Sequence, residues 1–261
     1  MAGRGSRFAA VAQENPEFRK PKPLINVRGV PMIVWSVRSL PFIDFPHHSA
    51  QTSFIVRPKE LTFICLEEHE EKFGITSVLQ THFTKQINIV LIPEVTRGAT
   101  ETALTATTYI ADREPLIISD SDHYFEGNPY CNVIREKMDS VAGIIPVFRP
   151  PDHDPKWSYT LFDKAGRALA VGEKDADLAK KGAYANIGAY FFSKGETFIN
   201  EAEAMIREND LYGADGKQEF YIAPLYQRLL EKGFGIQAAI IDKVWGLGTP
   251  RDLSYFLENH R

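Results

Sequence analysis

The first half of the chain alternates between two patterns of apolar residues. Compact apolar runs at 61–66, 88–92 and 114–119 are typical of short buried strands. Between them, apolar residues recur every three or four positions, which is typical of amphipathic helices. Strands that alternate with helices favour a parallel sheet with helices on both faces. The helices predicted in this half are 30–40, 67–83, 96–111 and 129–139.

The pattern becomes more mixed after residue 140, where turns containing Pro and Gly separate the apolar runs. We predict an α/β fold with a Rossmann-like, mixed and mostly parallel sheet. The sequence shows no internal repeat or convincing linker, so we expect residues 1–261 to form one domain with two lobes, 1–140 and 141–261. The strands predicted in the second lobe are 141–148, 158–162, 168–173, 186–192 and 235–241, and its helices are 195–209, 221–232 and 250–259.

The composition is typical of a globular protein with a substantial core, since 44% of the 261 residues are hydrophobic and 25% are charged. No apolar run approaches the roughly 18 residues that span a bilayer, and we see no signal-peptide pattern, so we expect no membrane association. A net charge of −4 argues against a nucleic-acid partner. Cys65 and Cys131 lack metal-ligand spacing, so we expect a reducing, cytoplasmic location.

Positive charge is concentrated at the start of the chain, where residues 1–40 carry seven Lys or Arg and only two Glu. A basic segment on an acidic chain suits a small anionic substrate. A solvated charged loop is the alternative interpretation.

Two glycines in this basic segment predict a polyphosphate cradle. Gly3 and Gly5 have no Cβ, so backbone N–H groups there can approach an anion closely. Arg7 and Lys22 can add full positive charges to the same anion. An ordinary turn is the alternative. A dinucleotide fingerprint does not fit, because its third glycine would fall at Phe8, and the Gly-Lys-Ser/Thr ending of a P-loop is missing.

A pair of aspartates follows the predicted strand 114–119. Alternation in an extended segment places Asp120 and Asp122 on one side, where a hard cation such as Mg²⁺ could bind. A turn or a helix cap is the alternative interpretation of this short acidic segment.

The motifs together resemble a known family. The pattern G-x-G-[ST]-R, then P-K-x-L, then G-x-P-M-I is similar to the signature of the nucleotidyltransferases that make NDP-sugars from NTPs and sugar phosphates. The resemblance covers nearly the whole chain and implies the nucleotide-diphospho-sugar transferase fold. The matching positions are Gly3, Gly5, Ser6, Arg7, Pro21, Lys22, Leu24, Gly29, Pro31, Met32 and Ile33.

The resemblance implies roles for residues of the nucleotide lobe. Arg7 would contact the departing pyrophosphate and Lys22 the α-phosphate, while Asp122 would hold Mg²⁺. Asp120 and Asp242 are further candidate ligands. The remaining nucleotide-binding residues implied are Gly3, Gly5, Ser6, Thr96 and Gly98.

The resemblance also implies an acceptor site in the second lobe. Glu173 and Lys174 would hold the sugar phosphate, although an exposed ion pair is the alternative from the residues alone. Asn186 and Gly188 match the family's N-x-G-x-Y strand. Glu219 resembles the acidic residue that contacts the sugar ring, with a capped buried helix as the alternative.

The sequence departs from the family's pattern at two places. Gly246 occupies the position of a second metal-binding aspartate. The printed sequence starts inside the glycine loop, so we expect the strand that precedes this loop in the family to be absent from it. We expect either that 53–56 fills the central position of the sheet or that two neighbouring strands stay apart.

The expected reaction joins an NTP to a sugar 1-phosphate and releases pyrophosphate. The acceptor phosphate has a second pKa of about 6. Its oxygen is therefore already an anionic nucleophile at neutral pH, and no general base is needed. A cytidylyltransferase for a non-sugar phosphate, such as phosphocholine or a phosphorylated amino acid, is one alternative, and a non-catalytic nucleotide-binding homologue is another. The sequence leaves homo-oligomer formation open.

Overall fold

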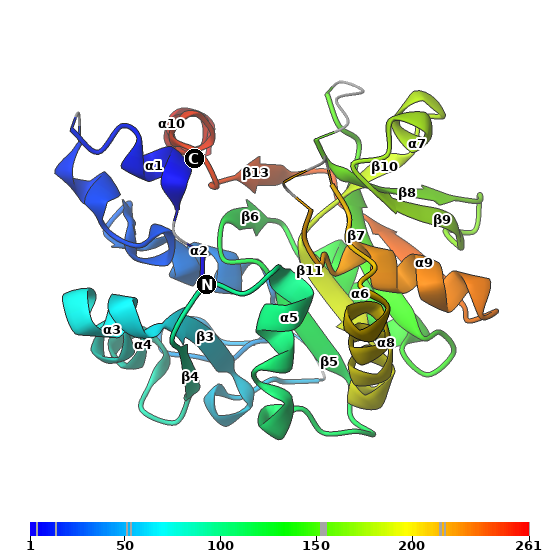
Figure 1. The fold of residues 1–261 in the computed structure, drawn as a ribbon, viewed down its shortest axis with the longest axis horizontal. Coiled ribbons are helices and arrows are strands. Elements are labelled where there is room, and N and C mark those ends of the chain that lie inside the picture. The colour runs from blue at the N-terminus through cyan, green and yellow to red at the C-terminus, as the bar shows by residue number, and fades with distance from the viewer. Residues whose placement is uncertain are drawn as a thin grey trace. The chain divides into compact units, whose positions relative to one another are not determined.

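The computed structural model describes residues 1–3, 5–13, 15–50, 52, 54–151, 156–213, 216 and 218–260. Contacts divide the chain into two compact units that alternate along the sequence (Figure 1). The first unit comprises Met1–Val95, Asp120–Cys131 and Lys243–Arg261, and the second comprises Thr96–Ser119 and Asn132–Asp242. Both contain helices and strands, which confirms the predicted α/β class.

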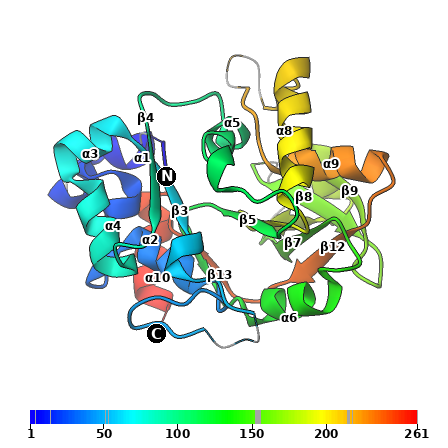
Figure 2. The same cartoon turned by 90° about the horizontal axis from the view of Figure 1, so that it is seen from below.

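A two-stranded parallel ladder lies in the first unit. β3 (Thr62–Leu66) pairs with β4 (Asn88–Ile92), and the chain between them forms α3 (Glu67–Phe73) and α4 (Ile75–Phe83). This helical connection is what two successive parallel strands require. Gly74 divides the single helix predicted here, because its φ of 57° is left-handed backbone that ends α3. Figure 2 shows both helices on one side of this ladder, and α3 contacts each strand.

The N-terminal segment is held by a tight hairpin. β1 (Asn26–Val27) and β2 (Val30–Pro31) are antiparallel, and the turn between them has positive φ at Arg28 (52°) and Gly29 (88°). Its apolar side chains pack beneath the C-terminal helix α10 (Pro250–Asn259). This core fixes the predicted phosphate-binding segment to the end of the chain. The buried members are Phe8, Ile25, Val27, Met32, Leu247, Leu253 and Phe256.

The other elements of the first unit are short. β6 (His123–Phe125) pairs antiparallel with β13 (Val244–Gly246), next to α2 (Met32–Arg38). The predicted helix 30–40 is therefore shorter, because Pro31 forms part of β2 and precedes the first turn. The remaining elements are α1 (Ser6–Ala9) and the 3₁₀ turns η1 (Pro16–Arg19), η2 (Lys22–Leu24) and η3 (Pro58–Glu60).

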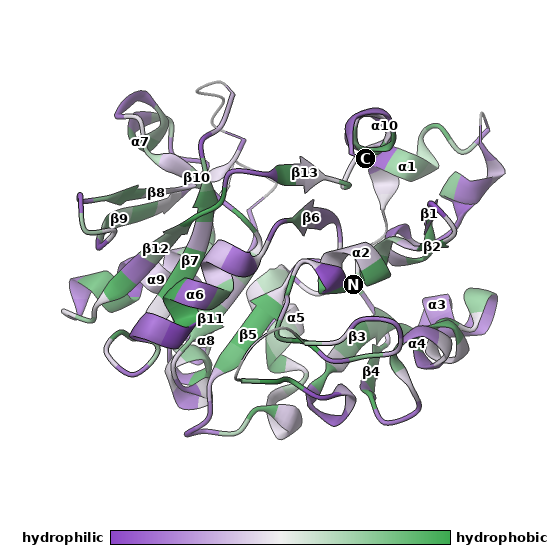
Figure 3. Cartoon of the chain, turned by 180° about the vertical axis from the view of Figure 1, so that it is seen from behind, coloured by the Kyte–Doolittle hydropathy of each residue, from purple (hydrophilic) through white to green (hydrophobic). Residues whose placement is uncertain are grey.

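The second unit contains the larger sheet, which has seven strands among the described residues. Neighbouring strands follow the order β5–β11–β7–β10–β8–β9. β12 lies outside this order and pairs with β7. Figure 3 shows that β5, β7 and β11 are strongly apolar. The strands are β5 (Leu116–Ser119), β7 (Gly143–Phe148), β8 (Ser158–Phe162), β9 (Ala168–Glu173), β10 (Tyr184–Asn186), β11 (Ala189–Phe192) and β12 (Ile236–Ile240).

The prediction of a mostly parallel sheet is wrong for this unit. Only β12 and β7 are parallel, whereas the five pairings within the order β5–β11–β7–β10–β8–β9 are antiparallel. The physical reason for the β8–β9 pairing is the connection length, since β9 follows β8 across a tight turn, and such a short link allows only antiparallel pairing. β10 and β11 are separated by two residues, and both run antiparallel to β7.

Helices pack against this sheet. α9 (Ala223–Glu231) contacts β9 and β12, and α8 (Gly195–Glu208) contacts α9 and β11. Their shared core includes Phe192, Phe198 and Tyr226. The remaining helices are α5 (Ala99–Leu104), the 3₁₀ turn η4 (Thr107–Tyr109), α6 (Asn128–Lys137) and α7 (Ala176–Lys180). None of the helices in the described ranges has the length and apolar character needed to cross a bilayer.

The strands of the two units form separate hydrogen-bonded sheets among the described residues. Among the described residues, β3 and β4 form a sheet of their own, and β5 pairs only with β11. Val56 of the candidate segment 53–56 makes an isolated bridge to Ile43 in the first unit. Ser53 lies outside the described residues.

Candidate functional site

The first unit brings two carboxylates and an imidazole together after β5. A carboxylate oxygen of Asp120, one of Asp122 and a ring nitrogen of His123 all lie within 4.8 Å of one another. The backbone here is fixed by Ser36, whose hydroxyl donates to the His123 carbonyl (2.8 Å) and accepts from the His123 N–H (3.3 Å). Asp242 is not a member of this group.

Lys22 reaches the same group from η2. Its Nζ lies 2.6 Å from Asp122 Oδ2, and the two side chains are each 25% exposed. Asp122 is also held through its backbone carbonyl, which accepts from the Leu247 N–H at 2.8 Å. Gly248 leaves room for the carboxylate, because a Cβ at this position would lie 2.6 Å from Asp122 Oδ2.

The pKa values of the three side chains in the group are shifted in different directions. Desolvation and then the charge of Asp122 raise the pKa of Asp120 to about 7, although part of its surface reaches solvent. Burial acts to raise the pKa of Asp122, but the charge and hydrogen bond of Lys22 hold it below its usual range. Burial lowers the pKa of His123 to about 4, so its imidazole is neutral at pH 7.

The predicted glycine loop lies beside Lys22. Gly5 has a φ of 61°, and a Cβ there would sit 3.5 Å from the Lys22 Cβ, so the loop backbone packs directly on this side chain. Ser6 and Arg7 begin α1 and are exposed, and Arg7 makes no ion pair with another described residue. Nothing crowds Gly3 within 4 Å of its would-be Cβ. The structure thus unites Gly5, Lys22 and Asp122.

The predicted base-binding loop is locked to another segment of the second unit. The Phe220 N–H donates to the Arg97 carbonyl (3.0 Å), and the Thr100 N–H donates to the Phe220 carbonyl (2.9 Å). Gly98 has a φ of 149°, and a Cβ there would lie 2.5 Å from the Phe220 nitrogen. Thr96 Oγ1 donates to the Gly98 carbonyl at 3.0 Å. The predicted helix 96–111 therefore begins only at Ala99.

Lys174, predicted to bind the acceptor phosphate, is exposed at the end of β9. Its ammonium donates to the Tyr221 hydroxyl at 2.5 Å and lies 4.5 Å from the centre of that ring. Glu173, next to it, is the cross-strand partner of Ser158. The structure therefore places Lys174 beside an aromatic residue that sequence reasoning did not assign.

The other predicted acceptor residues have different surroundings. Asn186 is 7% exposed, and its amide accepts from Thr160 Oγ1 (2.6 Å) and donates to Ser158 Oγ (2.7 Å). Gly188 lies in the link between β10 and β11. Glu219 is exposed and its backbone pairs with Tyr212, so the alternative of a buried capped helix is wrong.

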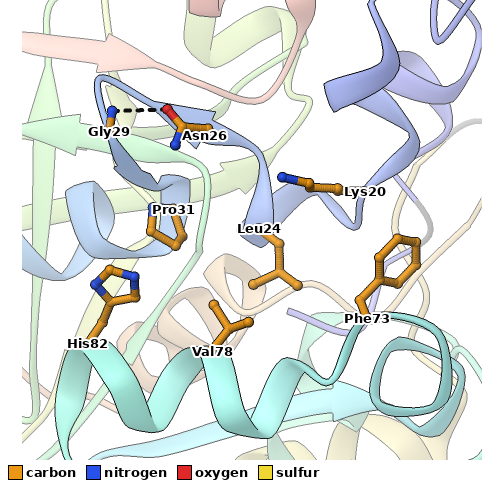
Figure 4. A pocket seen from close by; sticks show the side chains of 8 residues that line it. All are labelled: Lys20, Leu24, Asn26, Gly29, Pro31, Phe73, Val78 and His82. Atoms are coloured by element: carbon orange, nitrogen blue, oxygen red, sulfur yellow. Dashed lines mark hydrogen bonds between the residues drawn. The ribbon is translucent and has the colours of Figure 1, made fainter.

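Two cavities lie in the first unit. The larger, about 280 Å³, contains none of the predicted site residues (Figure 4). It is lined by Lys20, Leu24, Asn26, Gly29, Pro31, Phe73, Val78 and His82. The smaller, about 210 Å³, includes Gly5 and Pro21 in its lining. The charged groups Lys22 and Asp122 converge at 2.6 Å outside the lining of the larger cavity.

Sequence reasoning identified Lys22 and Asp122 but missed their supports. His123 directly follows the aspartates, and this adjacency was the available signal. Gly248 matches the Gly-Thr-Pro of the family's closing segment, but its contact with Asp122, like that of Tyr221 with Lys174, joins positions that are distant in sequence.

Solved structures of nucleotidyltransferases share this fold. The nucleoside-diphosphate-sugar pyrophosphorylase from Vibrio cholerae RC9 is 20% identical, with 99% of this chain and 98% of that chain covered and a TM-score of 0.76. A putative glucose-1-phosphate thymidylyltransferase from Bacillus anthracis is 16% identical (coverage 98% and 91%, TM-score 0.68). The inositol-1-phosphate CTP transferase from T. maritima is 14% identical (coverage 99% and 94%, TM-score 0.66).

These similarities confirm the fold predicted from the motif resemblance over nearly the full length of the chain. Neither the models of protein families nor the curated proteins give a match to the sequence.

Proposed function

We propose that this chain is a nucleotidyltransferase that joins an NTP to a sugar 1-phosphate, giving an NDP-sugar and pyrophosphate. The observation that carries the proposal is the Lys22–Asp122 pair at 2.6 Å beside Gly5. A cation, a carboxylate pair and a glycine loop are the groups needed to bind the phosphates of an NTP. The shared fold with an NDP-sugar pyrophosphorylase supports the same reaction class.

The reaction is an in-line displacement. An oxygen of the acceptor phosphate forms a bond to the α-phosphorus of the NTP, the bond from that phosphorus to its bridging oxygen breaks, and the electron pair leaves with pyrophosphate. Catalysis then consists of positioning and charge neutralisation. This requirement agrees with a site built from cations and carboxylates.

Lys22 and Arg7 supply the positive charges. Lys22 is paired with Asp122, and we propose that it moves to the α-phosphate when the NTP binds. Arg7 is exposed on α1 and would meet the departing pyrophosphate, with Gly3, Gly5 and Ser6 lining the phosphates. Asp122, with Asp120, would hold a divalent cation that neutralises phosphate charge, and the spacing within 4.8 Å fits such an ion.

The second unit would hold the base and the acceptor. We assign the nucleobase to the loop Thr96–Gly98, whose backbone is fixed by Phe220. Lys174, with Glu173 and Glu219, would orient the acceptor phosphate and sugar. Asn186 is engaged with Thr160 and Ser158, so we assign it to supporting β8 and β10 beside Gly188 rather than to direct contact.

A non-sugar acceptor is a second candidate. The fold likeness to an inositol-1-phosphate CTP transferase favours a cyclitol phosphate with CTP over a quaternary-ammonium phosphate. An aromatic cage for phosphocholine has less support, because Trp157 packs against Phe148, and Tyr190 against Tyr226.

The test is a pyrophosphate-release assay with each of the four NTPs and a panel of sugar 1-phosphates, inositol 1-phosphate and phosphocholine. We expect release with one NTP and one sugar 1-phosphate, a large loss in Asp122→Asn and a smaller loss in Asp120→Asn. No release with any pair, combined with NTP binding by titration, would instead indicate a non-catalytic nucleotide-binding protein. Both free cysteines are buried, which is compatible with the cytoplasmic location we propose.

A further inference from the structure

His123 carries a buried nitrogen that the protein does not satisfy. The side chain is 8% exposed, and Nε2 has no hydrogen-bond partner among the described residues. Buried polar atoms are nearly always hydrogen-bonded, so an exception calls for an explanation such as an ion. The backbone N–H and carbonyl of His123 both bond to the Ser36 hydroxyl, so the position of its Cα on β6 is fixed.

The ring lies close to the two carboxylates. One of its nitrogens and an oxygen from each of Asp120 and Asp122 all lie within 4.8 Å of one another. Two ligands on opposite sides of one small divalent ion are about 4.2 Å apart, from metal–ligand distances of about 2.1 Å. The three atoms are therefore within a small adjustment of binding a single ion.

The partner strand places no side chain directly opposite His123. His123 pairs with Gly246 across the β6–β13 ladder, and directly opposed residues project to the same face of a sheet. Because Gly246 has no side chain, β13 offers no ligand beside the imidazole. His123 is the residue positioned to complete the coordination in its place.

We propose that His123 is a direct ligand of the divalent cation held by Asp120 and Asp122, and that it selects Mn²⁺ or Co²⁺ over Mg²⁺. Mg²⁺ prefers oxygen ligands, whereas imidazole nitrogen suits transition metals. The proposal rests on the proposed function for the role of the ion, but its ligand set is tested without turnover.

Lys22 provides a second test of metal binding at this site. Its ammonium occupies Asp122 Oδ2 at 2.6 Å, so it competes with any metal ion for that oxygen. Lys22→Met keeps the length of the side chain and removes the charge. This variant binds Mn²⁺ a few-fold more tightly than the unaltered protein, even though it transfers nucleotide poorly.

Pulsed EPR of the Mn²⁺-loaded full-length chain tests the nitrogen ligand directly, because a bound imidazole modulates the spin echo through its ¹⁴N nucleus. We expect this modulation in the unaltered protein and its loss in His123→Leu. The matched control is His69→Leu, since His69 is 5% exposed and also has an unpartnered ring nitrogen, yet is not in the carboxylate group. His69→Leu keeps the modulation.

Metal titrations measure the preference of the site for Mn²⁺ and Co²⁺ over Mg²⁺. Removing an outer-sphere partner of a metal ligand lowers affinity by about 10- to 100-fold, so loss of a direct ligand in His123→Leu lowers Mn²⁺ and Co²⁺ affinity by at least about tenfold, and Mg²⁺ affinity by less. His123→Gln, which retains polarity, replaces the leucine variant if the latter does not fold.

Absence of ¹⁴N modulation in the unaltered Mn²⁺-loaded protein overturns the proposal, as does modulation that persists without His123 or a failure to bind Mn²⁺. Pyrophosphate release without nitrogen coupling would refute this ligand assignment and leave the proposed function intact. Nitrogen coupling without pyrophosphate release under any substrate pair would support this ligand assignment and refute the proposed function.

Discussion

The Nζ atom of Lys174 lies 2.5 Å from the Tyr221 hydroxyl oxygen and 4.5 Å from the centre of the Tyr221 ring. Burial acts to lower the pKa of Lys174, but the hydrogen bond with Tyr221 and its charge raise it overall. Lys174 also has a φ of 54°, in the left-handed region that a lysine rarely adopts. Tyr221 therefore determines where this ammonium is presented.

We expect Tyr221→Phe to raise KM for the acceptor about fivefold, because a hydrogen bond of this kind contributes roughly 1 kcal/mol. Lys174→Ala raises it further, and KM for the NTP changes little in either variant. Steady-state kinetics with each substrate varied separately measures the split, with Tyr109→Phe as the control because Tyr109 is 51% exposed. Equal effects on both substrates would contradict the assignment of Lys174 to the acceptor.

Gly248→Ala should damage the metal site while leaving the fold intact. The added Cβ would lie 2.6 Å from Asp122 Oδ2 and push this carboxylate aside, which a flexible side chain can accommodate. We expect at least about a tenfold loss of metal affinity, comparable to disturbing a partner of a metal ligand, with little change in melting temperature. Gly246→Ala is the control, since its Cβ would come no closer than 3.4 Å to Asp252. Similar metal affinities in both variants would argue against the role of Asp122.

Gly98→Ala should affect both substrates. A Cβ at this φ of 149° would lie 2.5 Å from the Phe220 backbone, so the loop and the 218–221 segment must separate. We expect a loss of roughly 2 kcal/mol of stability or more, from backbone strain and lost hydrogen bonds. Because Tyr221 follows Phe220, KM for the acceptor should rise together with that for the NTP. A change confined to the NTP would show that the two segments act independently.

Stability should fall at alkaline pH through Tyr212. Burial and then the Asp210 carboxylate raise the pKa of Tyr212 to about 12. A group whose pKa is raised by folding contributes its full stability at pH values below its ordinary pKa of about 10. That stability is lost as the pH rises to about 12. Urea unfolding across this range should show a shallower decline for Tyr212→Phe. Tyr255→Phe, at a residue that is 59% exposed, should follow the unaltered protein.

Local patterns predicted most elements but not how they pair. The runs 61–66 and 88–92 correspond to β3 and β4, because a buried apolar run with a helical connection has few alternatives. The sequence of short strands after residue 140 carried no comparable signal for direction. The antiparallel pairing of β8 with β9 follows from the turn at Gly166, with a φ of 78°, whereas the other antiparallel pairings join segments that are distant in sequence.

The site was predictable where adjacent residues carry the chemistry. Gly5, Lys22 and Asp122 lie in motifs whose order is readable, and the structure brings them together. The contributions of Gly248 and Phe220 could not be read, because each acts by the space it leaves or the backbone groups it offers to a distant segment.

The isolation of the β3–β4 ladder has a consequence for how the chain opens. Among the described residues, β3 and β4 pair only with each other and pack against α3, whereas β7 is hydrogen-bonded to β11, β10 and β12. Amide hydrogens of β3 and β4 should therefore exchange with solvent through local unfolding, long before those of β7, whose exchange requires the second unit to open. The first unit would then act as a separate cooperative unit, whose protection against exchange increases when an NTP binds to it.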